Sequence, residues 1–396
     1  MDLHMARLDL PAQIQVGKGS INRLHEFVLE RGGSRVFVLM DSFLASSPVN
    51  LDEKVTDILR KAKIESTVFS SYSGEPTTEH VNAALEIMRD FRADCVVGIG
   101  GGSALDLSKA VSLFGKSPDS KWAEIPNQPF LNRLPLLAIP TTAGTGSEAT
   151  KVMVITNTDT NLKMNPGHPD LIPDAAILDA QLTLSLPRTF TAYTGLDALT
   201  HAIEAYVSTR ATRMTDFFAL EAIRMIGKSL PVIYENGQDA DAREQMSIAS
   251  CYAGIAFSNA STNLAHAAGR SLGARFHIPH GLSVALLLPF VMTFGLEAAE
   301  KRYADVAIAL GAPPSLGVKE LAQTAVQIIE GYNDQFHIWS DGQKYVNPQD
   351  FGKDIHILAK DAMSGNGIAT NRRVPSQDDV AHIFELLGKK LSYVYS

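Results

Sequence analysis

Cysteine is scarce in this chain, which contains only Cys95 and Cys251 among its 396 residues. Cys95 lies in an apolar, strand-like run and Cys251 in a helix-like run, so they provide no disulfide framework. We therefore expect two buried thiols in a reducing compartment. The N-terminal segment also lacks the charged-then-apolar pattern of a secretion signal. These features predict a cytoplasmic protein.

Runs of basic residues are also absent, and the formal net charge is −8. This balance argues against a nucleic-acid partner. The longest apolar stretch, residues 282–296, is interrupted by Pro289 and is too short to span a bilayer. We interpret it as a buried helix and expect no membrane partner. A chain of this length, with 45% hydrophobic residues, is typical of two domains with large cores.

Strand-like and helix-like segments alternate up to about residue 185. This alternation predicts an α/β domain with a mainly parallel sheet and helices on both faces. The predicted strands are 36–40, 66–69, 95–99, 136–139 and 176–178, and the predicted helices are 21–31, 51–61, 77–90 and 103–113.

After Leu186-Pro187 the strand signals end and long runs with helical periodicity follow. We therefore predict an α/β domain over residues 1–186 and an all-helical domain over residues 187–396. The predicted helices of the second domain are 193–209, 215–236, 240–259, 283–310, 318–331 and 378–393.

Two loops in the first half have the composition of nucleotide-binding turns. The first is Gly100-Gly101-Gly102-Ser103, which follows an apolar run and precedes an amphipathic one. Glycine allows the backbone to approach a pyrophosphate, and the following helix N-terminus favours its charge. The second loop, Thr141 to Glu148, offers small hydroxyl residues and glycines after another apolar run. Either loop alone could be an ordinary turn, but the pair favours a nucleotide.

One carboxylate and three imidazoles in the second half could complete a shell around a divalent metal. Asp197 and His201 are four residues apart, so a helix would present both on one face. His266 and His280 follow further along the chain. Oxygen and nitrogen donors without thiolate suit Fe(II), Zn(II) or Mn(II). A single Asp-x-x-x-His pair is weak evidence, because helices carry such pairs by chance.

The order of the motifs differs from the usual dinucleotide fold, in which a spaced glycine motif comes first and an acidic residue follows about 20 residues later. Here the acidic candidate, Asp41, precedes the glycines. The chain instead resembles the iron-containing (group III) alcohol dehydrogenases over nearly its whole length. The segments that carry this resemblance are Gly100 to Ser103 with Asp106 and Lys109, Thr141 to Glu148, Pro173 to Asp179, the Asp197/His201 segment, Ala253 to Asn259, and His280-Gly281.

The resemblance implies a Rossmann-like, dehydroquinate synthase-like domain that binds NAD(H), and a helical catalytic domain that binds Fe²⁺, with Zn²⁺ or Mn²⁺ as alternatives. It makes Asp197, His201, His266 and His280 the metal ligands, and it suggests a homodimer. A carboxylate at Asp41 can accept both hydroxyls of the adenosine ribose and would repel a 2′-phosphate. The implied cofactor-binding residues are Asp41, Gly100, Gly101, Gly102, Ser103, Asp106, Thr141, Thr142, Thr145, Ser147, Val152 and Lys163.

One departure from the family pattern concerns the substrate. Family members commonly carry a histidine four residues after the third ligand, whereas this chain has Arg270 there. An anionic group on a small alcohol or aldehyde would suit this cation and the polar segment Ser261-Thr262-Asn263. Alternatively, Arg270 pairs with an acidic residue or with the cofactor pyrophosphate. His277 could replace the missing histidine as a proton relay, and so could solvent.

The resemblance thus implies a metal-dependent NAD(H) alcohol dehydrogenase or aldehyde reductase, in which the metal stabilises the oxygen that gains charge. A glycerol dehydrogenase-like or dehydroquinate synthase-like enzyme is the alternative within the superfamily. The metal sites of these two alternatives typically use three protein ligands. A fourth ligand at His280 therefore favours the alcohol dehydrogenase or aldehyde reductase. A non-enzymatic nucleotide-binding protein is disfavoured by the complete set of metal and cofactor residues.

Overall fold

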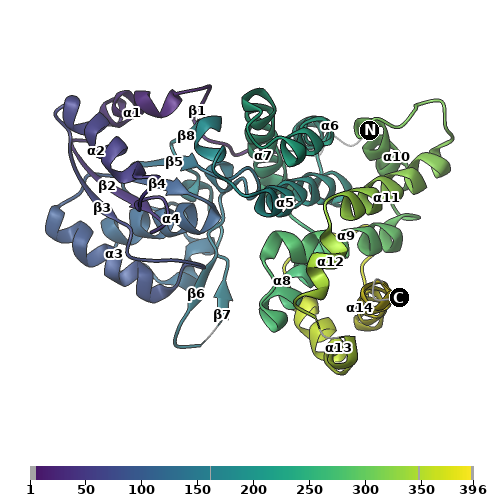
Figure 1. The fold of residues 1–396 in the computed structure, drawn as a ribbon. Helices are drawn as coiled ribbons and strands as arrows, with labels where there is room; N and C mark the ends of the chain where they lie inside the picture. The colour runs from purple at the N-terminus through teal and green to yellow at the C-terminus, as the bar shows by residue number, and fades with distance from the viewer. Residues whose placement is uncertain (1–5, 161, 347, 394–396) are drawn as a thin grey trace. The chain divides into compact units, whose positions relative to one another are not determined.

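The computed structural model describes residues 6–160, 162–346 and 348–393 (Figure 1). The chain divides into two compact units. One unit spans Asp9–Ser185, and the other contains Leu186–Ser396 together with the described residues before Asp9. The second unit thus also takes a short N-terminal segment that the sequence assigned to the first domain. The separate roles of the two domains stay predictions.

A six-stranded parallel sheet forms the centre of the first unit, with the strand order β1-β8-β5-β4-β2-β3. The predicted α/β class with a mainly parallel sheet is confirmed. The inner strands are apolar runs buried on both faces, as parallel sheets require. The strands are β1 (Gln13–Val16), β2 (Arg35–Met40), β3 (Glu65–Phe69), β4 (Cys95–Gly100), β5 (Leu136–Pro140) and β8 (Ala175–Leu178).

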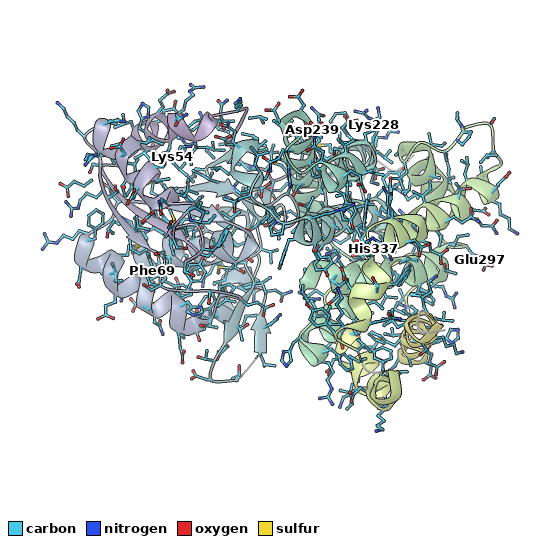
Figure 2. The ribbon with its side chains drawn as sticks, viewed as in Figure 1. Lys54, Phe69, Lys228, Asp239, Glu297 and His337 are labelled. Carbon is cyan, nitrogen blue, oxygen red and sulfur yellow. The ribbon has the colours of Figure 1, made fainter. Side chains whose placement is uncertain are left out.

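Helices cover both faces of this sheet because alternate residues of each strand point to opposite sides. Helices α3 (Thr78–Phe91) and α4 (Gly102–Lys116) pack on the face that contains Phe37 and Phe69. Those two rings stack with their centroids 6.4 Å apart, and Phe69 is labelled in Figure 2. Helices α1 (Leu24–Glu30) and α2 (Leu51–Lys61) pack on the opposite face.

The strand order contains a switch point between β2 and β4. From β2 the chain moves outward to β3, and it then returns to β4 on the other side of β2. In open parallel sheets, ligands bind beyond the carboxyl ends of the strands at such a point. Asp41 directly follows β2, and the Gly100 to Ser103 loop follows β4. Both sequence-predicted features therefore flank the switch point.

The second unit is built of helices and contains no strand among its described residues, as predicted. Its central helix, α5, is buried on almost every side and packs against α6, α7 and α9. No helix within the described residues has the length and apolar character needed to cross a bilayer. The helices are α5 (Arg188–Val207), α6 (Arg213–Glu235), α7 (Ala240–Ala260), α8 (Leu264–Phe276), α9 (His280–Gly295), α10 (Glu300–Ala309), α11 (Val318–Gln335), α12 (Ile338–Gln343), α13 (Pro348–Met363) and α14 (Gln377–Tyr393).

The prediction of one continuous helix over 283–310 is wrong. The segment forms α9 and α10, which are separated by a turn after Gly295. Apolar residues recur through both helices because α9 is buried on nearly every side and α10 buries one face, so the pattern does not reveal the break. The predicted strands and helices also did not include β1, α8, α12, α13, or the antiparallel pair β6 (Ile155–Asn157) and β7 (Leu162–Met164). Of these, β1, α12, β6 and β7 are short, with at most six residues each.

We predict that Gly98→Ala destabilises the first unit. A Cβ at Gly98 would lie 2.4 Å from the Ser108 Oγ, so β4 and α4 would have to separate. The expected loss of unfolding free energy is about 1–3 kcal/mol, the range for overpacked cores. Urea unfolding followed by circular dichroism measures it. The control is Gly352→Ala on α13, where a Cβ would meet nothing within 4 Å. Equal unfolding midpoints for the two variants would contradict the prediction.

Candidate metal centre and nucleotide loops

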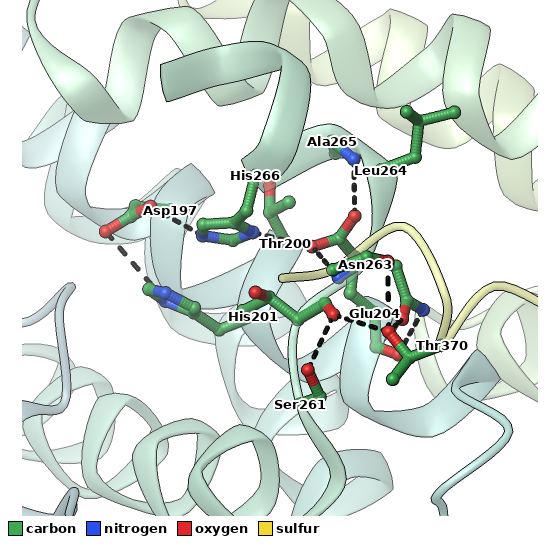
Figure 3. Close-up of polar contacts among 12 residues, drawn as sticks. Asp197, Thr200, His201, Glu204, Ser261, Asn263, Leu264, Ala265, His266 and Thr370 are labelled. Atoms are coloured by element: carbon green, nitrogen blue, oxygen red, sulfur yellow. Dashed lines mark hydrogen bonds and ion pairs between the residues drawn. The ribbon is translucent and has the colours of Figure 1, made fainter. Parts of the chain in front are cut away.

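Three helices of the second unit bring the three predicted histidine ligands to the carboxylate of the fourth ligand, Asp197. Figure 3 shows Asp197 with His201 and His266. Asp197 and His201 lie one turn apart on α5, and the His201 Nδ1 is 3.9 Å from the Asp197 Oδ2. His266 on α8 places its Nε2 3.5 Å from the Asp197 Oδ1. His280, the first residue of α9, places its Nε2 3.6 Å from the same oxygen. Residues separated by up to 83 positions in the sequence therefore meet at Asp197.

Close helix packing produces this convergence. A Cβ on Gly281 would lie 2.4 Å from the Tyr193 carbonyl oxygen, so only glycine allows the start of α9 to approach α5 so closely. The neighbouring residue, His280, is thereby brought to Asp197. The His201 ring is stacked between Phe257 of α7 and His266, with centroid distances of 4.1 and 4.2 Å. Aromatic packing thus restricts the orientation of this imidazole.

The donor atoms fit a divalent cation. Asp197, His201 and His266 are buried and each offers a ligand atom within 4.8 Å of the others, whereas His280 is partly exposed. The Asp197 Oδ1 and His266 Nε2 are buried without a hydrogen-bond partner. Buried polar atoms are normally satisfied, and an ion bound by both would satisfy them. One carboxylate with imidazole donors suits Fe(II), Zn(II) or Mn(II).

The electrostatics of the cluster favour an ionised carboxylate. Burial raises the pKa of Asp197, but the surrounding histidines outweigh burial and lower it overall. Burial lowers the pKa of His266, whereas Glu204 and Asp197 outweigh that effect and raise it to about 9. Asp197 therefore keeps its negative charge at neutral pH, and this charge attracts a cation.

Sequence reasoning missed the buried residue Glu204, whose Oε2 lies 2.6 Å from the His266 Nδ1. The spacing of Glu204 from two predicted metal ligands could have indicated that it lies near them. Glu204 follows His201 by three residues and Asp197 by seven, so all three share one face of α5.

In the first unit, the predicted nucleotide residues gather at the carboxyl ends of β2, β4 and β5. A Cβ on Gly100 would lie 3.5 Å from the Asp41 Oδ2, and Gly100 has a φ of 150°. Thr141 donates its backbone N–H to the Gly100 carbonyl oxygen. A Cβ on Gly102 would lie 2.8 Å from Thr145, and one on Gly101 would lie 3.5 Å from Thr142. Ser103 follows in the first turn of α4. The two loops therefore touch each other beside Asp41.

Asp41 is half-buried, and burial raises its pKa. Its Oδ1 accepts a weak hydrogen bond from the Leu44 backbone N–H at 3.4 Å, so it also supports the turn that follows β2. The second oxygen lies beside Gly100. A turn-capping role and a ribose-binding role are compatible, because each uses a different oxygen.

Two other predicted cofactor residues, Asp106 and Ser147, bind each other, and Lys109 binds a third, Val152. The Asp106 Oδ1 accepts a hydrogen bond from the Ser147 Oγ at 2.6 Å, and its Oδ2 accepts one from the Val154 backbone N–H. Fully buried Lys109 donates to Ser147, Thr150 and the Val152 carbonyl oxygen. Their polar groups therefore tie α4 to the 147–154 segment. Cofactor contacts by Asp106, Ser147 and Val152 stay predictions.

The remaining candidates are Lys163 and His277, which are exposed, and Arg270, which is half-buried. Lys163 on β7 pairs with Glu75 at 2.6 Å. His277 is exposed at the C-terminal end of α8, with a φ of 54°. Arg270 lies on α8, one turn after His266, and burial lowers its pKa while Glu204 opposes that shift. Its Nη2 would be 3.0 Å from a Cβ on Gly365. The roles predicted for these residues remain predictions.

The polar segment before α8 serves the protein itself. The Asn263 Nδ2 donates to the Glu204 carbonyl oxygen, and its Oδ1 accepts a hydrogen bond from Thr370. The Ser261 Oγ donates to the Thr262 carbonyl oxygen. The polarity of Asn263 and Ser261 is therefore explained by internal hydrogen bonds. It no longer argues for an anionic substrate.

Two family models match the chain. Residues 11–180 match the family described as iron-containing alcohol dehydrogenase, and residues 191–387 match the C-terminal part of the Fe-containing alcohol dehydrogenase family. The chain belongs to the iron-containing alcohol dehydrogenases. The predicted family is thereby confirmed, and the chain is an oxidoreductase of the alcohol dehydrogenase type.

Individual relatives agree with this membership. The chain is 45% identical over 302 residues to a probable alcohol dehydrogenase, EutG, of Escherichia coli K12, covering 76% of both chains. It resembles a solved 1,3-propanediol oxidoreductase with a TM-score of 0.91 and 31% identity, over 97% of this chain and 100% of the other. It also resembles a sulfoacetaldehyde reductase from Bifidobacterium kashiwanohense in complex with NAD⁺, with a TM-score of 0.86 and 28% identity, over 97% and 99% of the two chains.

Proposed function

We propose that this alcohol dehydrogenase is metal-dependent and uses NAD(H) to interconvert a small alcohol and its aldehyde. The observation that carries the proposal is the convergence of His201, His266 and His280 on the buried carboxylate of Asp197. Asp197 brings a negative charge, and each imidazole offers a nitrogen donor once a metal displaces the proton on that nitrogen. Iron(II) is the metal we propose from the family, with zinc or manganese as alternatives of similar ligand preference.

The residues divide the chemical work between them. A metal bound by this set would supply Lewis acidity toward the oxygen of the alcohol or aldehyde. The metal would be held by Asp197, His201, His266 and His280. Asp41 accepts the hydroxyls of the adenosine ribose, and the loops at Gly100 and Thr141 accommodate the phosphates. A nicotinamide bound there would supply or accept the hydride, so no protein nucleophile is needed.

Glycerol dehydrogenase-like and dehydroquinate synthase-like metal sites typically use three protein ligands. A site with four protein ligands therefore favours the alcohol dehydrogenase activity. NADH oxidation by the purified protein with added Fe(II), under anaerobic conditions and with a panel of aldehydes, tests the proposal. No metal-stimulated oxidation with any aldehyde would contradict it. The homodimer and the cytoplasmic location also stay predictions.

We further propose that the substrate carries an anionic group, which Arg270 binds. The guanidinium is half-buried and lies one turn from His266 on α8. An arginine remains a cation even when burial lowers its pKa. One structural relative reduces sulfoacetaldehyde, according to its name, and this aldehyde carries a sulfonate. A semialdehyde acid or phosphonoacetaldehyde offers similar chemistry.

Loss of metal ligands should abolish turnover. We predict that His201→Ala and His280→Ala each reduce the rate of NADH oxidation by at least about 100-fold, because metal affinity depends on the number of ligands. The fold and NADH binding should remain. Metal analysis and steady-state kinetics of the purified variants measure the effect, with His356→Ala, an exposed histidine on α13, as the control. Full metal occupancy with a normal rate in either ligand variant would refute this assignment.

The cofactor preference should depend on Asp41. We predict that the wild-type protein prefers NADH to NADPH by about 1–3 kcal/mol, because the carboxylate opposes a 2′-phosphate. Asp41→Gly should narrow or reverse this preference. The ratio of kcat/KM for the two cofactors measures it. Glu53→Ala, which removes an exposed carboxylate on α2, should leave the ratio unchanged. Comparable wild-type values for both cofactors would contradict the role of Asp41.

Arg270 should discriminate between anionic and neutral aldehydes. We predict that Arg270→Ala lowers kcat/KM for succinic semialdehyde or sulfoacetaldehyde by about ten- to a hundredfold, since a charge-assisted contact contributes roughly 1.5–3 kcal/mol. Activity on butanal or propanal should change far less. The control is Arg275→Ala, which removes an exposed arginine of α8 that pairs with Asp354. Equal losses on both classes of aldehyde would make Arg270 a structural or cofactor residue.

A further inference from the structure

Glu204 is a buried carboxylate that none of the proposed chemical steps uses. It lies on α5 with 2% of its surface exposed. An ionised carboxylate in such a place is costly unless hydrogen bonds compensate for the lost water. Its Oε1 accepts the Ala265 backbone N–H at 2.6 Å, and its Oε2 accepts the Asn263 backbone N–H at 2.9 Å. The Oε2 also lies 2.6 Å from the His266 Nδ1 (Figure 3).

Two of these contacts cap helix α8 from outside. The N-cap residue of α8, Asn263, forms no side-chain cap to its own helix. The first backbone N–H groups of a helix need acceptors, and a negative charge near them is favourable. Glu204 supplies both from the neighbouring helix α5. The start of α8 is therefore anchored to the same helix that carries Asp197 and His201.

The third contact determines which nitrogen of His266 faces the metal centre. A carboxylate only accepts hydrogen bonds, so the Nδ1 must carry the proton. The Nε2 is then the atom left to bind a metal, and it points toward Asp197, with 3.5 Å between it and the Oδ1. In metal sites, a carboxylate behind a histidine fixes the ring and makes the imidazole a stronger donor.

We propose that Glu204 is a positioning residue for the metal centre: it holds His266 in the tautomer and orientation that a metal requires, while it caps α8. This inference rests on the proposed metal function of Asp197, His201, His266 and His280. The two tasks of Glu204 use the same carboxylate, so metal affinity and the anchoring of α8 are coupled through one side chain.

The test is metal binding by the apo protein rather than enzyme activity. We expect Glu204→Gln to weaken Co(II) binding by about 10- to 100-fold in a chelator competition assay. The amide nitrogen of glutamine cannot accept hydrogen bonds, so one of the two contacting oxygens is lost. The visible absorption spectrum of the Co(II)-loaded variant should also change, because the geometry of the ligands alters. Glu204→Asp keeps the charge but withdraws it from the ring, and we expect an intermediate loss of affinity.

Asn263→Ala is the matched control. It removes the contacts of the Asn263 amide with the Glu204 carbonyl oxygen and with Thr370, but it leaves the carboxylate beside His266. We expect a lower melting temperature of the apo protein and Co(II) affinity within about threefold of wild type.

Glu204→Gln or Glu204→Asp with wild-type affinity and spectrum would overturn the inference. An equal loss of affinity in Asn263→Ala would also overturn it, because Glu204 would then act only through general stability. If the wild-type protein itself bound no Co(II), the proposed metal function would fail instead.

Discussion

The burial of one negative charge, that of Asp197, is the constraint on which the metal centre depends. A carboxylate withdrawn from water needs partners, and the partners here are three imidazoles from α5, α8 and α9. Glycine at position 281 allows α9 to approach α5, and Phe257 supports His201 from the opposite side. The helical packing is therefore organised around a polar centre.

The first unit relies on a different physical principle. Parallel strands end at the same edge of a sheet, so residues that follow the paired strands β2, β4 and β5 meet at that edge. Asp41, the triple glycine and the threonine loop are brought together in this way. Lys109 adds a further restraint, because its fully buried ammonium group binds oxygens of the 147–154 segment and so connects α4 with the second loop. A loop that already has a defined conformation loses less conformational entropy when a nucleotide binds than a mobile loop does.

Many of these features could be read from the chain directly. The alternation of strand-like and helix-like segments predicted the parallel sheet. The predicted metal ligands were recognisable by their residue types and by their order along the chain. The split of the 283–310 segment was not visible, since the apolar period continues across the break. From composition, the polar residues around Asn263 suggested a pocket for an anionic substrate, whereas the structure shows that Asn263 and Ser261 make internal hydrogen bonds.

The sequence by itself determined the family, the α/β and helical halves, and the candidates for metal and nucleotide binding, because these depend on local period and on motifs of fixed spacing. Only the tertiary structure decided which atoms meet. It brought His266 and His280 to Asp197, placed Gly100 beside Asp41, and put the carboxylate of Glu204 behind His266. Such meetings depend on how helices and strands distant in the chain pack, and spacing along the sequence does not encode distance across a packed interior.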